Sequence, residues 1–134
     1  TPLYSSAASD VYKRQLLAYG PMVTNALQAA EIGAQEGVSI EVIDLRSLSP
    51  IDYPTIFASV QKTGRAIIAH EAPTNVSLSS EISARITENL FYHLEAPVLR
   101  VGGFDTPYPP AKLEEAYLPD ADRILEAVDR IMAY

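Results

Sequence analysis

Residues 38–45 read Val-Ser-Ile-Glu-Val-Ile-Asp-Leu, and residues 65–70 read Arg-Ala-Ile-Ile-Ala-His. The first segment alternates between apolar and polar residues and then becomes largely apolar, and the second is a short apolar run. Both are therefore predicted to be strands. Between them, a helix is predicted from the N-cap Asp52 to about Thr63, and Gly64 ends it. A helix between two strands at this spacing makes a crossover connection, which joins parallel strands.

The same alternation extends in both directions from this unit. Upstream, an apolar run at 16–19 and a Gly20-Pro21 turn precede a helix whose expected apolar face is Met22, Ala26, Leu27, Ala30 and Ala34, closed by Gly37. Downstream, we expect a helix with a four-residue ladder, a strand at 97–101, a Pro-rich loop at 102–110, a helical turn at 113–117 and a last helix. The ladder is Ile82, Ile86, Leu90 and Leu94, and the stripe of the last helix is Ile124, Leu125, Val128, Ile131 and Met132. The chain is therefore predicted to form one α/β domain in three layers (α/β/α), around a mostly parallel sheet of four strands.

Composition limits the class of protein. The chain has 134 residues, no cysteine and a formal net charge of −7, with a pI near 4.7. An acidic chain is a poor binder of nucleic acid or of anionic membranes, so neither is expected as a partner. Without cysteine there is no disulfide scaffold and no thiolate metal site, and with no leader sequence apparent a reducing, cytoplasmic location is expected. Residues 105–130 hold seven acidic and three basic residues, an excess that suits solubility or the steering of a basic partner.

Ligands in open α/β sheets tend to bind beyond the carboxyl ends of the strands, where three segments are expected to meet: 19–22, 70–73 and 102–105. A tight turn explains Gly20-Pro21 better than a phosphate loop, because there is one glycine and Pro21 lacks an N–H. Neighbouring strand residues point to opposite faces, so a structural or interface role for His70 is favoured over a His70-Glu71 base pair in catalysis.

The remaining polar residues do not assemble a catalytic set. The acids at 114–115 and 120–122 are interpreted as solvated helix caps, and two histidines cannot build a metal cluster. The segment from Asp105 to Pro110, which includes Tyr108, is a stiff loop suited to docking or to an interface. No catalytic, cofactor-binding or metal-ligating residue is therefore predicted.

Five segments together resemble one family. They are Tyr-Gly-Pro-Met at 19–22, Glu-Val-Ile-Asp-Leu-Arg-Ser-Leu-Ser-Pro at 41–50, Lys-Thr-Gly-Arg at 62–65, His-Glu-Ala-Pro at 70–73 and Ala-Pro-Val-Leu-Arg-Val at 96–101. In this order and spacing, the chain from 16 to 134 resembles the C-terminal, transketolase-like domain of the beta subunit of the thiamine-diphosphate-dependent component of 2-oxo acid dehydrogenase complexes. The segments 104–110 and 117–120 look most like the branched-chain (2-oxoisovalerate) members, with the pyruvate members as the near alternative.

The resemblance implies a sheet of five strands, one of them antiparallel, where the pattern alone shows four. The fifth belongs just upstream of Leu16, in a segment, 1–15, that does not match the family. Because 6–15 resembles the adapter-derived ends of translated metagenomic fragments, we expect a fragment with a non-native start. Thiamine diphosphate with magnesium is implied for the full enzyme, an oxidoreductase, but not as a ligand of this domain alone.

The resemblance also implies partners. These are an alpha subunit and a second beta subunit in an α2β2 heterotetramer, and the peripheral subunit-binding domain of the acyltransferase. The resemblance implies that the beta subunit binds this domain through an acidic residue before the last strand and through its C-terminal carboxylate. The matching positions here are Glu95 and Tyr134, both expected to face basic side chains. A plain exposed acid at a helix end is the alternative for Glu95. His70, Glu71, Asp105 and Tyr108 are expected at subunit interfaces.

Some residues depart from the family pattern, and other functions stay open. Ser77 and Ser79 stand where glycines are usual, Thr24 where many members have histidine, and Gly102 where threonine is common. The alternatives to an assembly and docking domain are a stand-alone binding module of the same fold and a domain of another transketolase-like enzyme. The latter should carry phosphate-binding basic residues at the strand edge, and the segment from 70 to 80 has none.

Overall fold

The computed structural model describes residues 3–4 and 13–134. A five-stranded sheet in the order β1-β3-β2-β4-β5 forms the middle layer. Strands β2 (Lys13–Ala18), β3 (Ser39–Asp44), β4 (Ala66–Pro73) and β5 (Leu99–Gly103) run parallel, whereas β1 (Leu3–Tyr4) pairs antiparallel with β3. The α/β class and the mostly parallel sheet are thereby confirmed.

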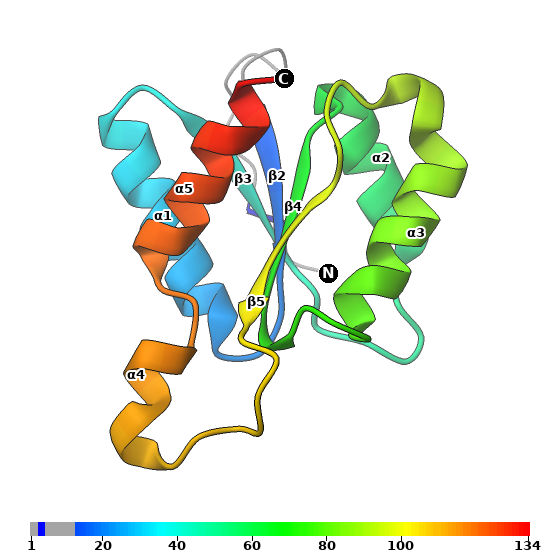
Figure 1. Ribbon diagram of the computed structural model, residues 1–134. Helices are drawn as coiled ribbons and strands as arrows, with labels where there is room; N and C mark the ends of the chain where they lie inside the picture. The colour runs from blue at the N-terminus through cyan, green and yellow to red at the C-terminus, as the bar shows by residue number, and fades with distance from the viewer. Residues whose placement is uncertain (1–2, 5–12) are drawn as a thin grey trace.

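Helices cover both faces of the sheet. Helices α1 (Met22–Gln35) and α5 (Ala121–Met132) lie on one face, and α2 (Tyr53–Thr63) and α3 (Leu78–Leu90) lie on the other (Figure 1). Each face has its own apolar cluster, with Ile67 and Ile124 in the first and Ile68 and Ile86 in the second. This arrangement arises because alternate residues of a strand point to opposite faces.

Capping residues set the start of α2 and α5 and the end of α2 where the sequence predicts them. The Asp52 carboxylate accepts a hydrogen bond from the Thr55 N–H at 3.2 Å, and Gly64 closes α2 with φ +69°. At the start of α5, the Asp120 carboxylate accepts from the Arg123 N–H at 2.9 Å. The short helix α4 (Glu114–Tyr117) follows a 3₁₀ turn at Ala111–Leu113, close to the predicted helical turn.

Strand β2 begins earlier than its apolar run indicated. Lys13, Arg14 and Gln15 pair with β3 and are buried, so the domain boundary expected at Leu16 lies inside a central strand. Gln15 fits there because its side chain donates to Glu41 and to Ser59, each at 2.9 Å. Whether the first 15 residues are native stays a prediction, and 5–12 lie outside the described residues.

Three other details differ from the expected pattern. Helix α3 ends at Leu90, and a 3₁₀ turn at Phe91–His93 follows, so Leu94 is not on the helix. Met132 and Leu27 are each 38% exposed rather than part of the core. Leu27 lies outside the core because the buried face of α1 is narrower than the predicted one and consists mostly of small residues. Its members are Met22, Ala26, Ala29 and Gly33.

Candidate functional site

Glu95 stands at the end of the sheet where the parallel strands begin. Its backbone N–H donates to the Gly64 carbonyl at 2.9 Å, which joins the segment before β5 to the end of α2. A Cβ at Gly64 would lie 2.6 Å from the His93 carbonyl oxygen and 3.1 Å from the Glu95 nitrogen. Glycine at 64 therefore permits both the positive φ and the close approach that positions Glu95.

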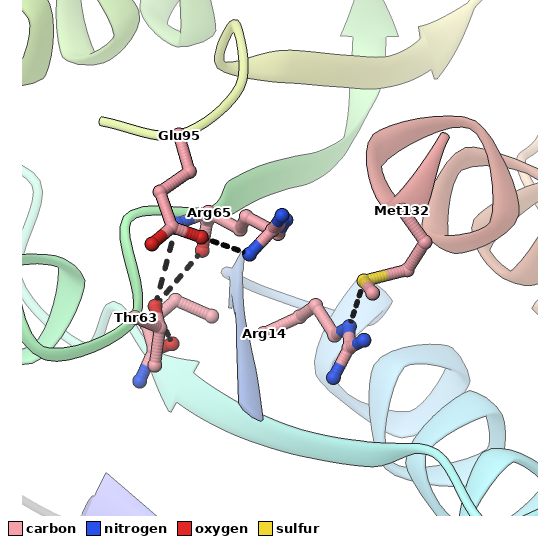
Figure 2. A network of polar contacts seen from close by, with 6 residues as sticks. Arg14, Thr63, Arg65, Glu95 and Met132 are labelled. Atoms are coloured by element: carbon pink, nitrogen blue, oxygen red, sulfur yellow. Dashed lines mark hydrogen bonds and ion pairs between the residues drawn. The ribbon is translucent and has the colours of Figure 1, made fainter. Parts of the chain in front are cut away.

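The Glu95 carboxylate is paired on its inner side. Arg65 donates from Nη1 to Glu95 Oε2, as Figure 2 shows. The Arg65 side chain is 15% exposed and that of Glu95 is 60% exposed, so the carboxylate remains open to solvent. A pair this exposed adds little stability, but it restrains the side chain at the surface.

Positive charge gathers behind this pair. Arg14 is buried beside Met132 of α5 and donates from Nε to the Met132 sulfur (Figure 2). Burial, followed by the nearby Arg65 cation, lowers the pKa of Arg14. Arg65 Nε is itself buried and has no hydrogen-bond partner among the described residues. A basic partner at Glu95 would therefore meet a carboxylate whose charge is partly offset from below.

Tyr134 lies at the same end of the molecule as Glu95. It follows α5, whose last turn reaches the end of the sheet where the parallel strands start (Figure 1). Tyr134 is 66% exposed. The structure thus brings both predicted docking residues to one end of the sheet, on segments that flank opposite faces.

The four predicted interface residues belong to the opposite end. His70 is fully buried, so it can support an interface only from beneath. Its ring is parallel to that of Tyr19, with centroids 6.4 Å apart and an interplanar angle of 4°. Neither ring nitrogen makes a hydrogen bond of ordinary geometry to a described residue. Burial lowers the pKa of His70, and the Arg100 cation lowers it further against the opposing effect of the Ala72 backbone.

Glu71 follows His70 in β4, and Asp105 lies in the loop after β5. Burial raises the pKa of Tyr19, and the negative charge of Glu71 raises it further. Asp105 accepts a hydrogen bond from the Asn75 N–H at 3.3 Å, which joins the loop after β5 to the loop after β4. Tyr108 is 55% exposed. These residues therefore lie around one strand edge, but without a shared hydrogen-bond network.

Tyr108 is held within its own loop. Its hydroxyl donates to Glu114, and this bond, followed by burial and nearby negative charge, raises the pKa of Tyr108 to about 12. Its ring meets the buried Tyr117 edge-on at 5.3 Å, and Phe104 also packs edge-on against Tyr117 at 6.3 Å. The Pro-rich loop thus presents two exposed aromatic rings on a buried third.

Arg100 is a member of this edge that sequence analysis missed. It donates to the Thr74 carbonyl and, at 2.8 Å, to the Ser80 hydroxyl. Ser77 and Ser79, which replace the usual glycines, share a 2.6 Å hydrogen bond, and Ser79 is fully buried. No local signal points to Arg100, because its partners, in the loop after β4 and at the start of α3, are 26 and 20 residues earlier.

The described residues offer no ligand set for the magnesium ion that accompanies thiamine diphosphate in the family. No group of three His, Asp or Glu side chains that could hold a metal ion occurs in that part of the chain. A cavity of about 330 Å³ at the end of β3 is lined by two carboxylates, Asp44 and Asp52. These already bind Arg46 at 3.1 Å and the Thr55 N–H at 3.2 Å. No reaction step is assigned to this chain.

Residues 9–124 match the family model of the transketolase C-terminal domain. This match covers most of the chain and includes every parallel strand described above. The chain belongs to the transketolase C-terminal domain family. The fold agrees with a solved structure described as a split-gene transketolase, an inactive beta4 tetramer. That match has a TM-score of 0.73 at 30% identity and covers 91% of this chain and 39% of the other.

Relatives of this transketolase C-terminal domain are named as beta subunits of 2-oxo acid dehydrogenases. It is 65% identical over 119 residues to the pyruvate dehydrogenase E1 component subunit beta of Leifsonia xyli subsp. xyli. It is 51% identical over 118 residues to the 3-methyl-2-oxobutanoate dehydrogenase subunit beta of Mycobacterium tuberculosis. The alignments cover 89% and 87% of this chain but 35% and 34% of those relatives, so the chain spans about a third of their length. The predicted family resemblance is confirmed, and both pyruvate and branched-chain types occur among the relatives.

One further finding concerns membranes. Within 3–4 and 13–134, none of the helices has both the length and the hydropathy that crossing a bilayer requires.

Proposed function

We propose that this chain is the C-terminal assembly and docking domain of a 2-oxo acid dehydrogenase beta subunit. The whole enzyme would decarboxylate pyruvate or a branched-chain 2-oxo acid oxidatively and pass the acyl group to lipoamide. Thiamine diphosphate with magnesium would supply that chemistry from another part of the enzyme. This domain would contribute contacts with an alpha subunit, with a second beta subunit and with the acyltransferase.

The placement of Glu95 is the observation that supports the docking role most directly. Gly64 holds the backbone of Glu95 and Arg65 holds its carboxylate at the end of the sheet, yet 60% of the Glu95 side chain is exposed. Tyr134 lies at the same end of the sheet and is also exposed. Fixed surface charges of one sign govern the association rate and specificity of a basic partner.

Calorimetry with a basic peripheral subunit-binding domain of an acyltransferase tests this role. Glu95→Gln should weaken binding and reduce the dependence of binding on salt. Glu95→Lys should abolish binding, because the lysine places a second cation beside Arg65. Glu31→Gln, an exposed acid on α1, should leave binding unchanged. If the folded chain does not bind, or if both Gln variants behave alike, the docking role is wrong.

We also assign the second beta-subunit contact to the opposite end of the sheet. Tyr108 and Phe104 are 55% and 56% exposed there, and Asp105 lies between them in the chain. Exposed aromatic residues in a stiff loop suit a protein interface, because little side-chain entropy is lost on contact. Sedimentation velocity over a range of concentrations should show self-association that Tyr108→Ser weakens; equal behaviour of the two chains would refute this assignment.

Glu95 gives no support to a stand-alone binding module over a dehydrogenase domain, since both would use the same surface. Co-purification of the full-length beta subunit with an alpha subunit separates them. An isolated beta subunit that binds no alpha subunit but still binds the basic domain would favour the module.

A further inference from the structure

A groove runs beside Glu95 on the α3 face of the domain. It has a volume of about 640 Å³ and lies between the second half of α3 and the segment that leads into β5. Its lining residues are Ser83, Thr87, Phe91, Leu94, Glu95, Ala96, Pro97 and Val98. Most of these are apolar, and Leu94 and Val98 pack against the second core cluster, so the floor of the groove is part of the folded domain.

Phe91 is the lining residue that the core does not explain. Helix α3 ends at Leu90, which is 5% exposed, whereas Phe91 begins the 3₁₀ turn and is 64% exposed. Its ring meets Tyr92 edge-on, with centroids 5.4 Å apart, but Tyr92 is itself 95% exposed. A phenylalanine beside an apolar groove, left in water, is the kind of residue that anchors a partner.

The charge of the groove limits what can occupy it. Glu95 is the one charged residue among those described that line it, and Arg65 holds only one of its carboxylate oxygens. The hydroxyls of Ser83 and Thr87 form the rest of the polar rim. An anionic occupant would be repelled, and a purely apolar one would leave the second carboxylate oxygen of Glu95 without a partner.

We propose that this groove receives a basic segment in which an apolar side chain lies next to a lysine or arginine. The apolar side chain packs beside Phe91 and Leu94, and the cation binds the free oxygen of Glu95. This inference rests on the docking role proposed for Glu95 and adds the apolar half of the surface. It makes Phe91 a specificity-determining residue, because Glu95 alone would accept any cation.

The test uses the 134-residue chain and the same basic acyltransferase domain, titrated at several salt concentrations. Phe91→Ser should weaken binding by about tenfold while the salt dependence stays that of the wild type. Phe91→Leu should restore most of the affinity. The matched control is Leu113→Ser, which removes an apolar side chain of similar exposure, 57% against 64%, in the 3₁₀ turn before α4 and should leave binding unchanged.

The outcomes separate the two proposals. If Glu95→Gln weakens binding and Phe91→Ser does not, the docking role stands and the groove is overturned. Equal losses from Phe91→Ser and Leu113→Ser would mean general apolar association and would also overturn it. If the wild-type chain is folded by circular dichroism and does not bind, both proposals fail. Because Phe91 lies outside the core, unchanged thermal unfolding of Phe91→Ser checks that a loss of binding is not a loss of fold.

Discussion

Gly64→Ala should cost this domain considerably more stability than Gly37→Ala, although both glycines have a positive φ. Gly64 has φ +69° and Gly37 has φ +81°. At either position, an L-residue pays about 1 kcal/mol for the left-handed conformation. The difference lies in the space around each: nothing stands within 4 Å of a Cβ at Gly37, whereas at Gly64 the His93 carbonyl oxygen would be 2.6 Å away.

This contact cannot be relieved by turning a side chain, because it is made by backbone. Overpacking of this kind adds about 1–3 kcal/mol, so Gly64→Ala should destabilise by about 2–4 kcal/mol in total. For a chain of 134 residues, 1 kcal/mol corresponds to about 4 °C in Tm. The melting temperature should therefore fall by about 4 °C in Gly37→Ala and by about 8–16 °C in Gly64→Ala.

Urea unfolding followed by far-UV circular dichroism gives both free energies, and the difference between the two variants isolates the steric contact. Gly64 also accepts the Glu95 N–H, so Gly64→Ala should weaken binding of the basic domain even where the chain is still folded. Equal destabilisation by the two substitutions would refute the reasoning, since it would mean that the segment before β5 moves away without cost.

Three other predictions concern buried or strained residues. His70 has a lowered folded pKa, so well above pH 6.5 it is neutral in both states and adds no pH dependence; as the pH falls through about 6.5, the unfolded chain binds the proton first. Stability should then fall by up to about 1.4 kcal/mol per pH unit, and His70→Leu should flatten this slope between pH 7 and 5 in urea unfolding; an identical slope would show that His70 is not its source. Val76 is 94% exposed with φ +51°, so Val76→Gly should raise Tm by about 2–4 °C in a thermal melt through relief of backbone strain, and a lower Tm would contradict this. Gln15→Leu removes a donor from the buried Glu41 and should cost about 1–3 kcal/mol, whereas the double variant with Glu41→Leu should recover part of it in the same assay. Additive losses would show that the two side chains are not coupled.

The order of the elements is determined by local sequence. The caps Asp52 and Asp120 and the terminating Gly64 act through hydrogen bonds and φ angles within a few residues, so the bounds of α2 and the start of α5 were predicted closely. The short apolar run at β4 is also a local signal, because a strand buried on both faces is apolar throughout and needs no alternation with polar residues. Local chemistry of this kind is present in the sequence before any long-range contact forms.

Only the tertiary structure could decide which polar residues lie inside and which partners meet. Gln15 reads as a surface residue, yet it is fully buried, because Glu41 and Thr63 supply hydrogen bonds from β3 and α2. Arg65 and Glu95 are thirty positions apart, and their pairing depends on β4 and β5 starting at the same edge of the sheet. A side chain's environment is set by neighbours distant in the chain, whereas helix caps and strand runs are set by neighbours in sequence, and this is why the sequence predicted the layers of the domain but not the chemistry at their ends.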